Sequence, residues 1–359
     1  MTDNRDTLKA IHYTAIGVMS GSSLDGVDLA WCEFSLDQGI WRFRIKEART
    51  VPYSKDMQGR LLAVMDGSAL ELARLHRDVG KFIGTAAGEM LNGRSIDVIA
   101  SHGHTVFHKP DEGLTTQIGC GATIAVWSRT PTVCDFRTKD VALGGQGAPL
   151  VPLGEKLLFP QHDSFLNLGG IANLSLHRGA VIGYDIGPCN QALNTLAIEA
   201  GLEFDRDGEM ARSGSVDASL LNRLDALPFH NQARPRSLGR EWFNERMLPL
   251  ITDRRIGLAD RLRTVTTHIA SIAASELNGQ DPTTTLATGG GAHNGFLIEL
   301  IRSMTRVGIV IPDRVIIDFK EALIFALLGV LRSRGEATAL ASVTGASGDS
   351  IGGSVYLPN

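Results

Sequence analysis

Apolar and polar residues alternate in three runs at the start of the chain, and glycine or aspartate separates the runs. They are HYTAIGVM, VDLAWCEF and WRFRIKEA, with the turn-rich SGSSLDG after the first. Turn residues between alternating apolar runs predict antiparallel hairpins. Residues 55–92 predict helices because apolar side chains recur at spacings of three and four, namely Leu61, Leu62, Met65, Leu72, Leu75 and Val79. A short strand is expected over residues 96–103.

The second half of the chain repeats this opening. FLNLGG, IANLSLHRG and AVIGYDIG predict three strands joined by glycine turns. Strands are also expected at TTLATGGG and RVGIVIP, and helices over residues 190–200, 255–278, 292–302 and 320–333. Because both halves begin with the same strand, turn, strand, strand unit, we infer an internal duplication.

The duplication predicts two mixed α/β lobes with a nucleotide cleft between them. We expect an N-terminal lobe over residues 1–140 and a C-terminal lobe over residues 141–359 that holds the adenosine-binding region. The boundary is placed near VALGGQGAP, residues 141–149, where glycine and proline concentrate. As an alternative, the C-terminal segment packs on the first lobe.

Composition and charge exclude several classes. The apolar run Leu323 to Leu331 has nine residues, whereas a membrane span needs roughly twenty. The N-terminus mixes both charges and shows no apolar signal region. Four scattered cysteines without CxxC spacing argue against a zinc ribbon or a disulfide scaffold and favour a reducing cytoplasm. A formal net charge of −4 speaks against a nucleic-acid binder.

Glycine is the unusual part of the composition. The chain has 40 glycines in 359 residues, above the usual share of about 7%. They gather in clusters beside apolar runs rather than in a linker. Glycine at a strand end lets the backbone approach a ligand, above all a phosphate. This pattern favours an enzyme that uses a nucleotide.

The first cluster is GVMSGSSLDGVDLA. Its strand ends at Ser20 and Gly21, and the hydroxyls of Ser22 and Ser23, with backbone amides of the turn, are suited to phosphate oxygens. Two carboxylates of the same segment are suited to Mg²⁺ or to fixing the loop, Asp25 and Asp28. The alternative is an ordinary hairpin closed by Asp-Gly.

Two further clusters follow strands of the second half. In GYDIGPCN, Asp185 ends an apolar strand, where a carboxylate faces the crevice that binds ligands in α/β proteins. It is a candidate base, with a helix N-cap as the alternative. In LATGGGAHNGFL, Gly289–Gly291 leave room for adenosine, with close strand–helix packing as the alternative.

SHGHTVFHKP brings His102, His104 and His108 close together in sequence. A spacing of two on a strand places His102 and His104 on one face. A zinc site is one interpretation, but no thiols or carboxylates are arranged nearby. Polar residues that line a substrate site are the interpretation we favour.

Nine motifs in order across nearly the whole chain resemble the 1,6-anhydro-N-acetylmuramic acid kinase family of bacterial cell-wall recycling. They are GVMSGSSLDGVD, SHGHTVFH, QIGCGATIA, DFRTKDVALGGQGAPLVP, NLGGIANLS, YDIGPCN, SLGREWFN, ATGGGAHN and SVTGA. The family belongs to the superfamily of sugar kinases, actin and heat-shock chaperones. The resemblance therefore implies an α/β fold with two duplicated ribonuclease-H-like lobes.

The resemblance also implies a reaction in which ATP, Mg²⁺ and water convert the anhydro sugar to ADP and N-acetylmuramic acid 6-phosphate. Asp185 matches the family's catalytic aspartate and is expected to activate the water. Asp25 is expected to hold Mg²⁺. ATP and its phosphates are assigned to Gly21, Ser22, Ser23, Leu24, Asp25, Gly26, Val27, Asp28, Gly169, Gly170, Gly187, Asn190, Gly289, Gly290 and Gly291.

The same match assigns the sugar to Arg137, Glu321 and His104. A planar guanidinium at Arg137 suits the lactyl carboxylate. The alternative role for Glu321 is a favourable interaction with the dipole of the helix that it begins. The implied partners are this sugar and ATP, with no nucleic acid and no membrane. The family further suggests a homodimer in the cytoplasm.

Several positions depart from the family's pattern: Ser22, His104, Thr138, Cys189, Asn194, Arg236 and Leu238. Such substitutions in the sugar site are expected in a related kinase that acts on another amino sugar or anhydro sugar, which is the first alternative. A second alternative is an ATP-dependent conformational protein like actin, and a third is an inactive relative. Asp185, the phosphate turn and the triple glycine keep the pattern, which favours an active kinase.

Overall fold

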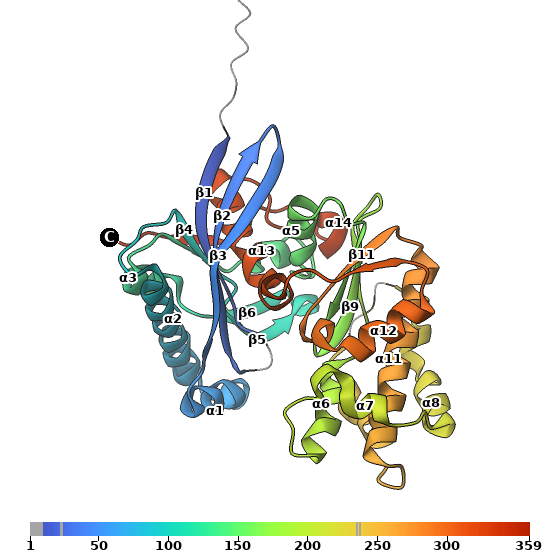
Figure 1. Cartoon of the computed structure of the whole chain (residues 1–359). Helices are drawn as coiled ribbons and strands as arrows, with labels where there is room; N and C mark the ends of the chain where they lie inside the picture. The colour runs from blue at the N-terminus through green and yellow to red at the C-terminus, as the bar shows by residue number, and fades with distance from the viewer. Residues whose placement is uncertain (1–9, 22–23, 235, 237) are drawn as a thin grey trace, which may run out of the picture. The chain divides into compact units, whose positions relative to one another are not determined.

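The computed structural model of the chain describes residues 10–21, 24–234, 236 and 238–359 (Figure 1). Two compact units are present. The first unit consists of Met1–Pro160 together with Phe319–Asn359, and the second is the continuous segment Gln161–Asp318. Ser22 and Ser23, which the sequence assigns to phosphate binding, lie outside the described residues.

The first unit is built on a six-stranded sheet with the order β13-β7-β4-β1-β2-β3. Strands β1, β2 and β3 are antiparallel neighbours, and β4 and β7 continue the sheet in parallel with β1. The bounds are β1 Ile11–Met19, β2 Gly26–Asp37, β3 Ile40–Pro52, β4 Val98–Ser101, β7 Thr132–Cys134 and β13 Ser354–Tyr356. A separate hairpin contains β5 His104–Lys109 and β6 Leu114–Ile118.

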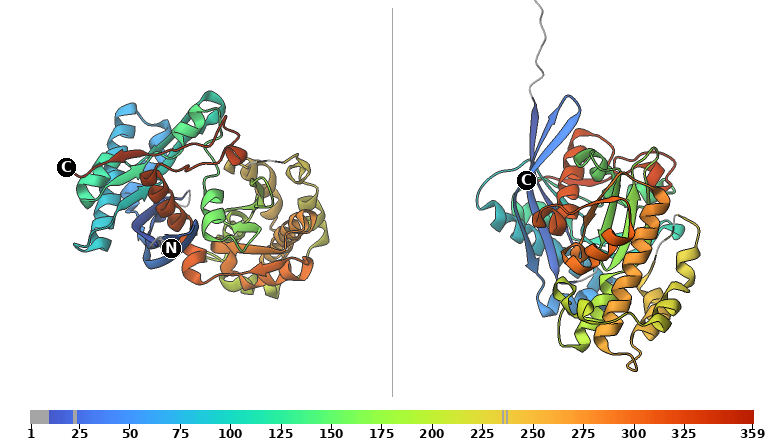
Figure 2. Two further views of the ribbon diagram at one scale, coloured as in Figure 1. Left: turned by 90° about the horizontal axis from the view of Figure 1, so that it is seen from above. Right: turned by 45° about the vertical axis from the view of Figure 1, so that its right-hand side comes forward.

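Helices cover both faces of this sheet (Figure 1). Ile16 and Val18 pack into one core with Val79 of α2, whereas Gly17, which points the other way, lies against α13. The helices of this unit are α1 Lys55–Ala63, α2 Ala69–Leu91, α3 Gly121–Ser128, α4 Thr138–Ala142, α5 Val151–Leu158 and α14 Ala341–Thr344, with the 3-10 helices η1 Val64–Asp66 and η2 Pro110–Glu112. Helix α13 Arg314–Arg334 begins in the second unit and belongs to the first from Phe319 on. The last strand, β13, lies beside β7 and α3 (Figure 2).

The second unit holds a five-stranded sheet with the order β10-β9-β8-β11-β12. Its strands are β8 Ser164–Leu168, β9 Ile171–Leu176, β10 Ile182–Pro188, β11 Thr284–Thr288 and β12 Gly308–Val310. The α-helices are α6 Asn190–Glu199, α7 Glu209–Ser213, α8 Ala218–Asp225, α9 Arg240–Trp242, α10 Leu248–Ile251, α11 Leu258–Gln280 and α12 Gly295–Met304. The 3-10 helices are η3 Arg206–Gly208, η4 Pro228–Asn231 and η6 Gly290–His293, and η5 Phe243–Met247 is a π-helix.

The two sheets share one topology, which confirms the predicted duplication and the α/β class. In each, the first three strands are antiparallel and the next two continue in parallel with the first. The β3-β2-β1-β4-β7 order of the first unit therefore corresponds to β10-β9-β8-β11-β12 in the second. This is the ribonuclease-H-like arrangement that the resemblance implies.

The division of the chain differs from the expected boundary after residue 140. Residues 141–160 and 319–359 belong to the first unit, so the C-terminal segment does return to it. The apolar run of α13 explains the return, because a Cβ on Gly329 would lie 2.5 Å from the Cβ of Ala100 in β4. The glycine-rich segment 141–149 is a tight loop inside the first unit rather than a linker.

Candidate functional site

The β1–β2 turn of the first unit is wider than a two-residue hairpin. Met19 pairs with Asp28 as the last partners of the two strands. Leu24 has a φ of 58°, and a Cβ on Gly26 would lie 2.9 Å from the Cα of Pro52. The absence of a side chain at Gly26 is therefore explained by the close approach of β3. The ordinary tight hairpin is excluded.

Hydrogen bonds tie this turn to β3. The backbone amide of Tyr53 donates to the Asp25 carbonyl at 3.1 Å, and the Thr50 hydroxyl donates to Oδ1 of Asp28 at 2.5 Å. Burial, together with the charges of Asp25 and Asp28, raises the pKa of Tyr53 to about 12. Both candidate carboxylates thus lie near the buried phenol of Tyr53.

His104 contacts the residue that follows β1. Its Nδ1 is 3.1 Å from the hydroxyl of Ser20, which is in turn 2.9 Å from the Tyr53 hydroxyl. Burial lowers the pKa of His104, so this side chain is neutral at pH 7. The structure therefore connects a predicted substrate residue to the predicted phosphate turn within one unit.

Arg137 is the N-cap residue of α4, three residues after the end of β7, and has fixed partners. It donates from Nη1 to the Gly147 carbonyl at 2.8 Å and from Nε and Nη2 to Nε2 of His102. The attractive interaction between Arg137 and Glu321 contributes to the pKa of each. Burial nevertheless raises the pKa of the Glu321 carboxyl. Two of the three predicted sugar-binding residues of the first unit are thus brought together.

Asp140 holds the loop that carries Gly147. Its Oδ2 accepts from the Gly147 amide and its Oδ1 accepts from the Thr344 hydroxyl, both at 2.8 Å. Thr344 belongs to the SVTGA motif, so the structure gives that motif a supporting role beneath Arg137. Asp140 was not among the predicted site residues, because its burial and its contact with Thr344 depend on the tertiary structure.

Asp185 lies in β10 of the second unit, where the β9–β10 register shifts between Asp185 and Gly187. Its amide donates to the Arg236 carbonyl at 3.0 Å, and its Oδ2 accepts from the Leu238 amide at 2.8 Å. Helix α6 begins at Asn190, with Cys189 at its N-cap. The helix-cap alternative for Asp185 is therefore excluded.

The segment that binds Asp185 is itself anchored. Nη2 of Arg236 donates to Oε1 of Glu276 at 2.6 Å, and both side chains are buried. Leu238 contacts Asp185 through its backbone amide, so the departure from the family pattern at Leu238 leaves this contact intact. Arg236, where the family resemblance has a lysine as the usual residue, likewise keeps a positive charge at its position.

Several predicted ATP-binding residues of the second unit also lie close together. The amide of Asn190 donates to the Gly169 carbonyl at 3.1 Å, and its Nδ2 donates to the Leu168 carbonyl at 2.9 Å. A Cβ on Gly291 would lie 2.8 Å from the Cβ of Leu168, whereas a Cβ on Gly170 meets nothing within 4 Å. Close packing thus explains Gly291, and open space lies beside Gly170.

The remaining glycines of this group differ in their surroundings. Gly289 has a φ of 80° and would place a Cβ 2.5 Å from Oδ1 of Asn167. A Cβ on Gly290 would lie 3.3 Å from Nδ2 of Asn190, and one on Gly187 would lie 3.6 Å from the His230 ring. Backbone conformation and close packing therefore account for Gly289 without a ligand.

The three histidines of SHGHTVFHKP have separate partners. His102 contacts Arg137, His104 contacts Ser20, and Nδ1 of His108 is 3.1 Å from the Thr115 hydroxyl. Among the described residues, no group of three or more His, Cys, Asp or Glu side chains could hold a metal ion. The zinc interpretation is therefore not supported in this part of the chain.

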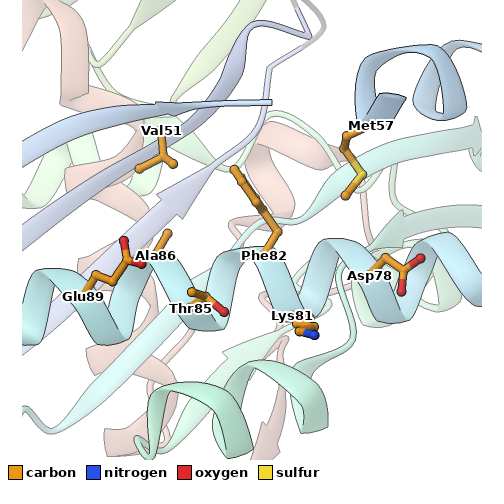
Figure 3. Close-up of a pocket in the computed structure, with 8 residues that line it drawn as sticks. All are labelled: Val51, Met57, Asp78, Lys81, Phe82, Thr85, Ala86 and Glu89. Carbon is orange, nitrogen blue, oxygen red and sulfur yellow. The ribbon is translucent and has the colours of Figure 1, made fainter. Parts of the chain in front are cut away.

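An open groove of about 480 Å³ lies on the first unit (Figure 3). Phe82 of α2 lies between Val51 of β3 and Met57 of α1, and Asp78 and Glu89 are at its edge. None of the predicted site residues lines it. No helix in the described part of the chain is long and apolar enough to cross a membrane.

The duplicated strand order places the chain in the fold class of the actin-like ATPases and sugar kinases. A family model for anhydro-N-acetylmuramic acid kinase matches residues 13–358, and the chain belongs to that family. A relative of that name from Gloeobacter violaceus (strain ATCC 29082 / PCC 7421) is 36% identical, over 92% of this chain and 95% of its own. Another from Xanthomonas oryzae pv. oryzae (strain MAFF 311018) is 37% identical, over 95% and 96%.

Solved structures show weaker likeness. A ROK family glucokinase from Streptomyces griseus in complex with glucose and AMPPNP has a TM-score of 0.41 at 15% identity, covering 88% of this chain and 99% of its own. The (R)-2-hydroxyglutaryl-CoA dehydratase component A from Acidaminococcus fermentans has a TM-score of 0.46 at 12% identity, covering 90% and 99%.

Proposed function

We propose that this chain is an ATP-dependent kinase that opens the 1,6-anhydro bridge of 1,6-anhydro-N-acetylmuramic acid and phosphorylates O6. The products are N-acetylmuramic acid 6-phosphate and ADP, in the recycling of the bacterial cell wall. The observation that carries the proposal is the family match over residues 13–358. The reaction consumes ATP, which favours the cytoplasm as its location, and the homodimer stays a prediction.

Asp185 is the proposed base. It takes a proton from water as the water oxygen bonds to C1 of the sugar, and the C1–O6 bond breaks. O6 then bonds to the γ-phosphorus, and the bond from that phosphorus to ADP breaks. A positioned carboxylate contributes about a hundredfold to ten-thousandfold to such a step. The hydrogen bond from the Leu238 amide fixes the orientation of this carboxylate.

Arg137 and Glu321 are the proposed sugar-binding residues of the first unit, with His104 nearby. Arg137 suits the lactyl carboxylate because a guanidinium binds a planar carboxylate through parallel hydrogen bonds. Glu321 has a raised pKa, so its carboxyl is better able than an ordinary glutamate to donate a hydrogen bond to a sugar oxygen.

Asn190, Gly169 and Gly170 are the proposed contacts to ATP in the second unit, with Gly187 and Gly289–Gly291. In the first unit, the described residues of the turn, Gly21 and Leu24 to Asp28, are proposed to face the phosphates. Mg²⁺ is usually held by one or two carboxylates plus substrate phosphates, and Asp25 with Asp28 fits that donor set. When bound, Mg²⁺ supplies positive charge against the transferring phosphoryl group.

Substitution of Asp185 by Asn tests the proposal. We expect turnover to fall by about a hundredfold to ten-thousandfold while the Kd for ATP stays within about twofold, because the amide keeps the shape and loses the base. The assay uses ATP, Mg²⁺, the anhydro sugar and ¹⁸O-labelled water, with products analysed by mass spectrometry. Glu203→Gln, at an exposed position of the same unit, is the matched control.

The outcomes separate the alternatives. A 6-phosphate with one ¹⁸O at C1 from the unsubstituted chain supports the proposal. Near-normal activity of Asp185→Asn removes Asp185 from the mechanism. ATP binding without product directs the search to another amino or anhydro sugar. ATP hydrolysis that needs no sugar favours the conformational protein.

A further inference from the structure

His102 and Arg137 are joined by hydrogen bonds in the interior of the first unit. His102 follows β4, and this residue is 3% exposed. Its Nδ1 lies 2.9 Å from the Gly103 carbonyl oxygen. Because a carbonyl only accepts, Nδ1 carries the ring proton. In this tautomer Nε2 accepts, and Arg137 donates to it from Nε at 3.0 Å and from Nη2 at 2.9 Å.

The imidazole of His102 is neutral and fixed in orientation. Arginine has no hydrogen-bond acceptor, so its contact with Nε2 requires an unprotonated nitrogen. Burial and the charge of Arg137 lower the pKa of His102 to about 3. The ring of Phe325, in α13, lies with its centroid 4.9 Å from that of His102. His102 is therefore a rigid, uncharged acceptor at neutral pH.

The Nη1 group of Arg137, which does not contact His102, is also fixed by a hydrogen bond. Its Nη1 donates to the Gly147 carbonyl at 2.8 Å, and Gly147 has a φ of 65° that favours glycine. A guanidinium carries five N–H donors. Within the described residues, the contacts with His102 and Gly147 use three donors. The geometry leaves two N–H groups for a ligand.

The nearby carboxyl groups do not form a direct ion pair with Arg137 among the described residues. Both oxygens of Asp140 accept other hydrogen bonds, from the Gly147 amide and the Thr344 hydroxyl. Burial raises the pKa of Glu321, which favours its uncharged form. The hydrogen bonds that orient Arg137 are thus accepted by neutral groups. Asp140 and Glu321 act on its charge without a hydrogen bond, and their attraction raises the pKa of Arg137 against the larger effect of burial.

We propose that His102 is a positioning residue that presents the charged edge of Arg137 to a carboxylate of the substrate. An acidic partner in place of His102 would orient the guanidinium equally well but would compensate its charge and weaken its attraction for an anion. A neutral acceptor keeps both orientation and charge. The inference rests on the proposed function, and it predicts that an acidic sugar is preferred over a neutral one.

The test compares two sugars and two substitutions. The sugars are 1,6-anhydro-N-acetylmuramic acid and the same anhydro sugar without the lactyl group. We expect His102→Leu to raise the KM for the acidic sugar about tenfold to a hundredfold, with little change in kcat. The KM for the lactyl-free sugar and the KM for ATP stay within about twofold. His102→Gln offers a neutral amide oxygen, and we expect it to restore most of the loss.

A double-substitution cycle shows whether His102 acts through Arg137. We expect Arg137→Ala alone to weaken binding of the acidic sugar, and His102→Leu to add less than about twofold in that background. Thermal unfolding midpoints and binding of ATP serve as checks that each variant is folded. If His102→Leu is unfolded, the comparison of His102→Gln with His102→Asn, both neutral acceptors of different reach, replaces it.

Each outcome decides the inference. Equal loss for both sugars, no loss for either, or additive effects of the two substitutions would overturn the positioning role while leaving the proposed function intact. A wild-type chain that phosphorylates neither sugar overturns the proposed function, and this inference with it. A selective loss for the acidic sugar that disappears in the Arg137→Ala background supports both.

Discussion

At the scale of single residues, the first unit buries an ion pair next to a candidate site residue. Nζ of Lys320 lies 2.6 Å from Oε1 of Glu155, and each side chain is 4% exposed. The pair joins α13 to α5, and Glu321 is the next residue along α13. A buried ion pair contributes little net stability, but loss of one partner leaves a buried charge without its counterion.

Removal of Glu155 alone is therefore expected to be costly. Glu155→Leu should lower the free energy of unfolding by about 3–5 kcal/mol, because Lys320 keeps a buried charge. The double variant Glu155→Leu with Lys320→Met should recover much of that loss. Urea unfolding of the three chains measures both effects. A loss below about 1 kcal/mol in the single variant would show that the charge of Lys320 is compensated without Glu155, for example by Glu321.

At the scale of elements, the contact between β1 and α13 depends on a glycine. A Cβ on Gly17 would lie 2.6 Å from the backbone nitrogen of Ala326 and would overlap the Ala322 carbonyl oxygen. Backbone atoms cannot rotate away as a side chain can, so the helix itself has to shift. The apolar face of α13 therefore packs directly on the backbone of the strand.

Gly17→Ala is expected to destabilise the chain by about 1–3 kcal/mol or more, since the added methyl group separates helix and sheet. Gly59→Ala in α1 is the matched control, because a Cβ there meets nothing within 4 Å. We expect that control to stabilise the chain by about 0.5–1 kcal/mol. Equal effects of the two changes, measured by thermal unfolding, would argue against the close contact of β1 with α13.

At the scale of the whole molecule, both units bury histidines that favour the neutral form. Burial is the main cause, and it lowers the pKa of His102 in the first unit to about 3 and that of His230 in the second to about 4. Burial also lowers the pKa of other histidines, namely His76, His104, His108, His162 and His268. In the unfolded chain a histidine has a pKa of about 6.5.

These lowered pKa values make the free energy of unfolding depend on pH. Between pH 6.5 and pH 4 the unfolded chain binds protons that the folded chain does not, so the stability falls as the pH falls. Each fully shifted histidine contributes about 1.4 kcal/mol per pH unit at most. Glu321, with its raised pKa, acts in the opposite direction but is one group against several. Urea unfolding at pH 7.5, 6 and 5 measures the slope.

His102→Gln is the control for that slope, because it removes one titrating group and keeps a neutral acceptor. We expect a shallower loss of stability in this variant between pH 6 and pH 5. A free energy of unfolding that stays constant from pH 7 to pH 5 would contradict the neutral, buried state of these histidines.

Sequence patterns predicted the elements well where periodicity is local. The opening strands of both halves, the helices over residues 55–92 and the turn after β8 are confirmed within a few residues. The family resemblance assigned Asn190 and Gly169 to ATP without relating them to each other, and the structure joins them by a hydrogen bond. By contrast, the spacing of His102 and His104 predicted one shared face, whereas the two side chains have different partners because Gly103 turns the backbone between them.

The sequence alone determined the α/β class, the duplication and the family, since alternation, turn residues and ordered motifs are local properties of the chain. Only the tertiary structure decided that residues 319–359 join the first unit, that Asp140 and Thr344 support the loop beneath Arg137, and that His102 accepts from Arg137. These features depend on contacts between residues far apart in the chain. Burial and hydrogen-bond geometry set such contacts, and no local pattern records them.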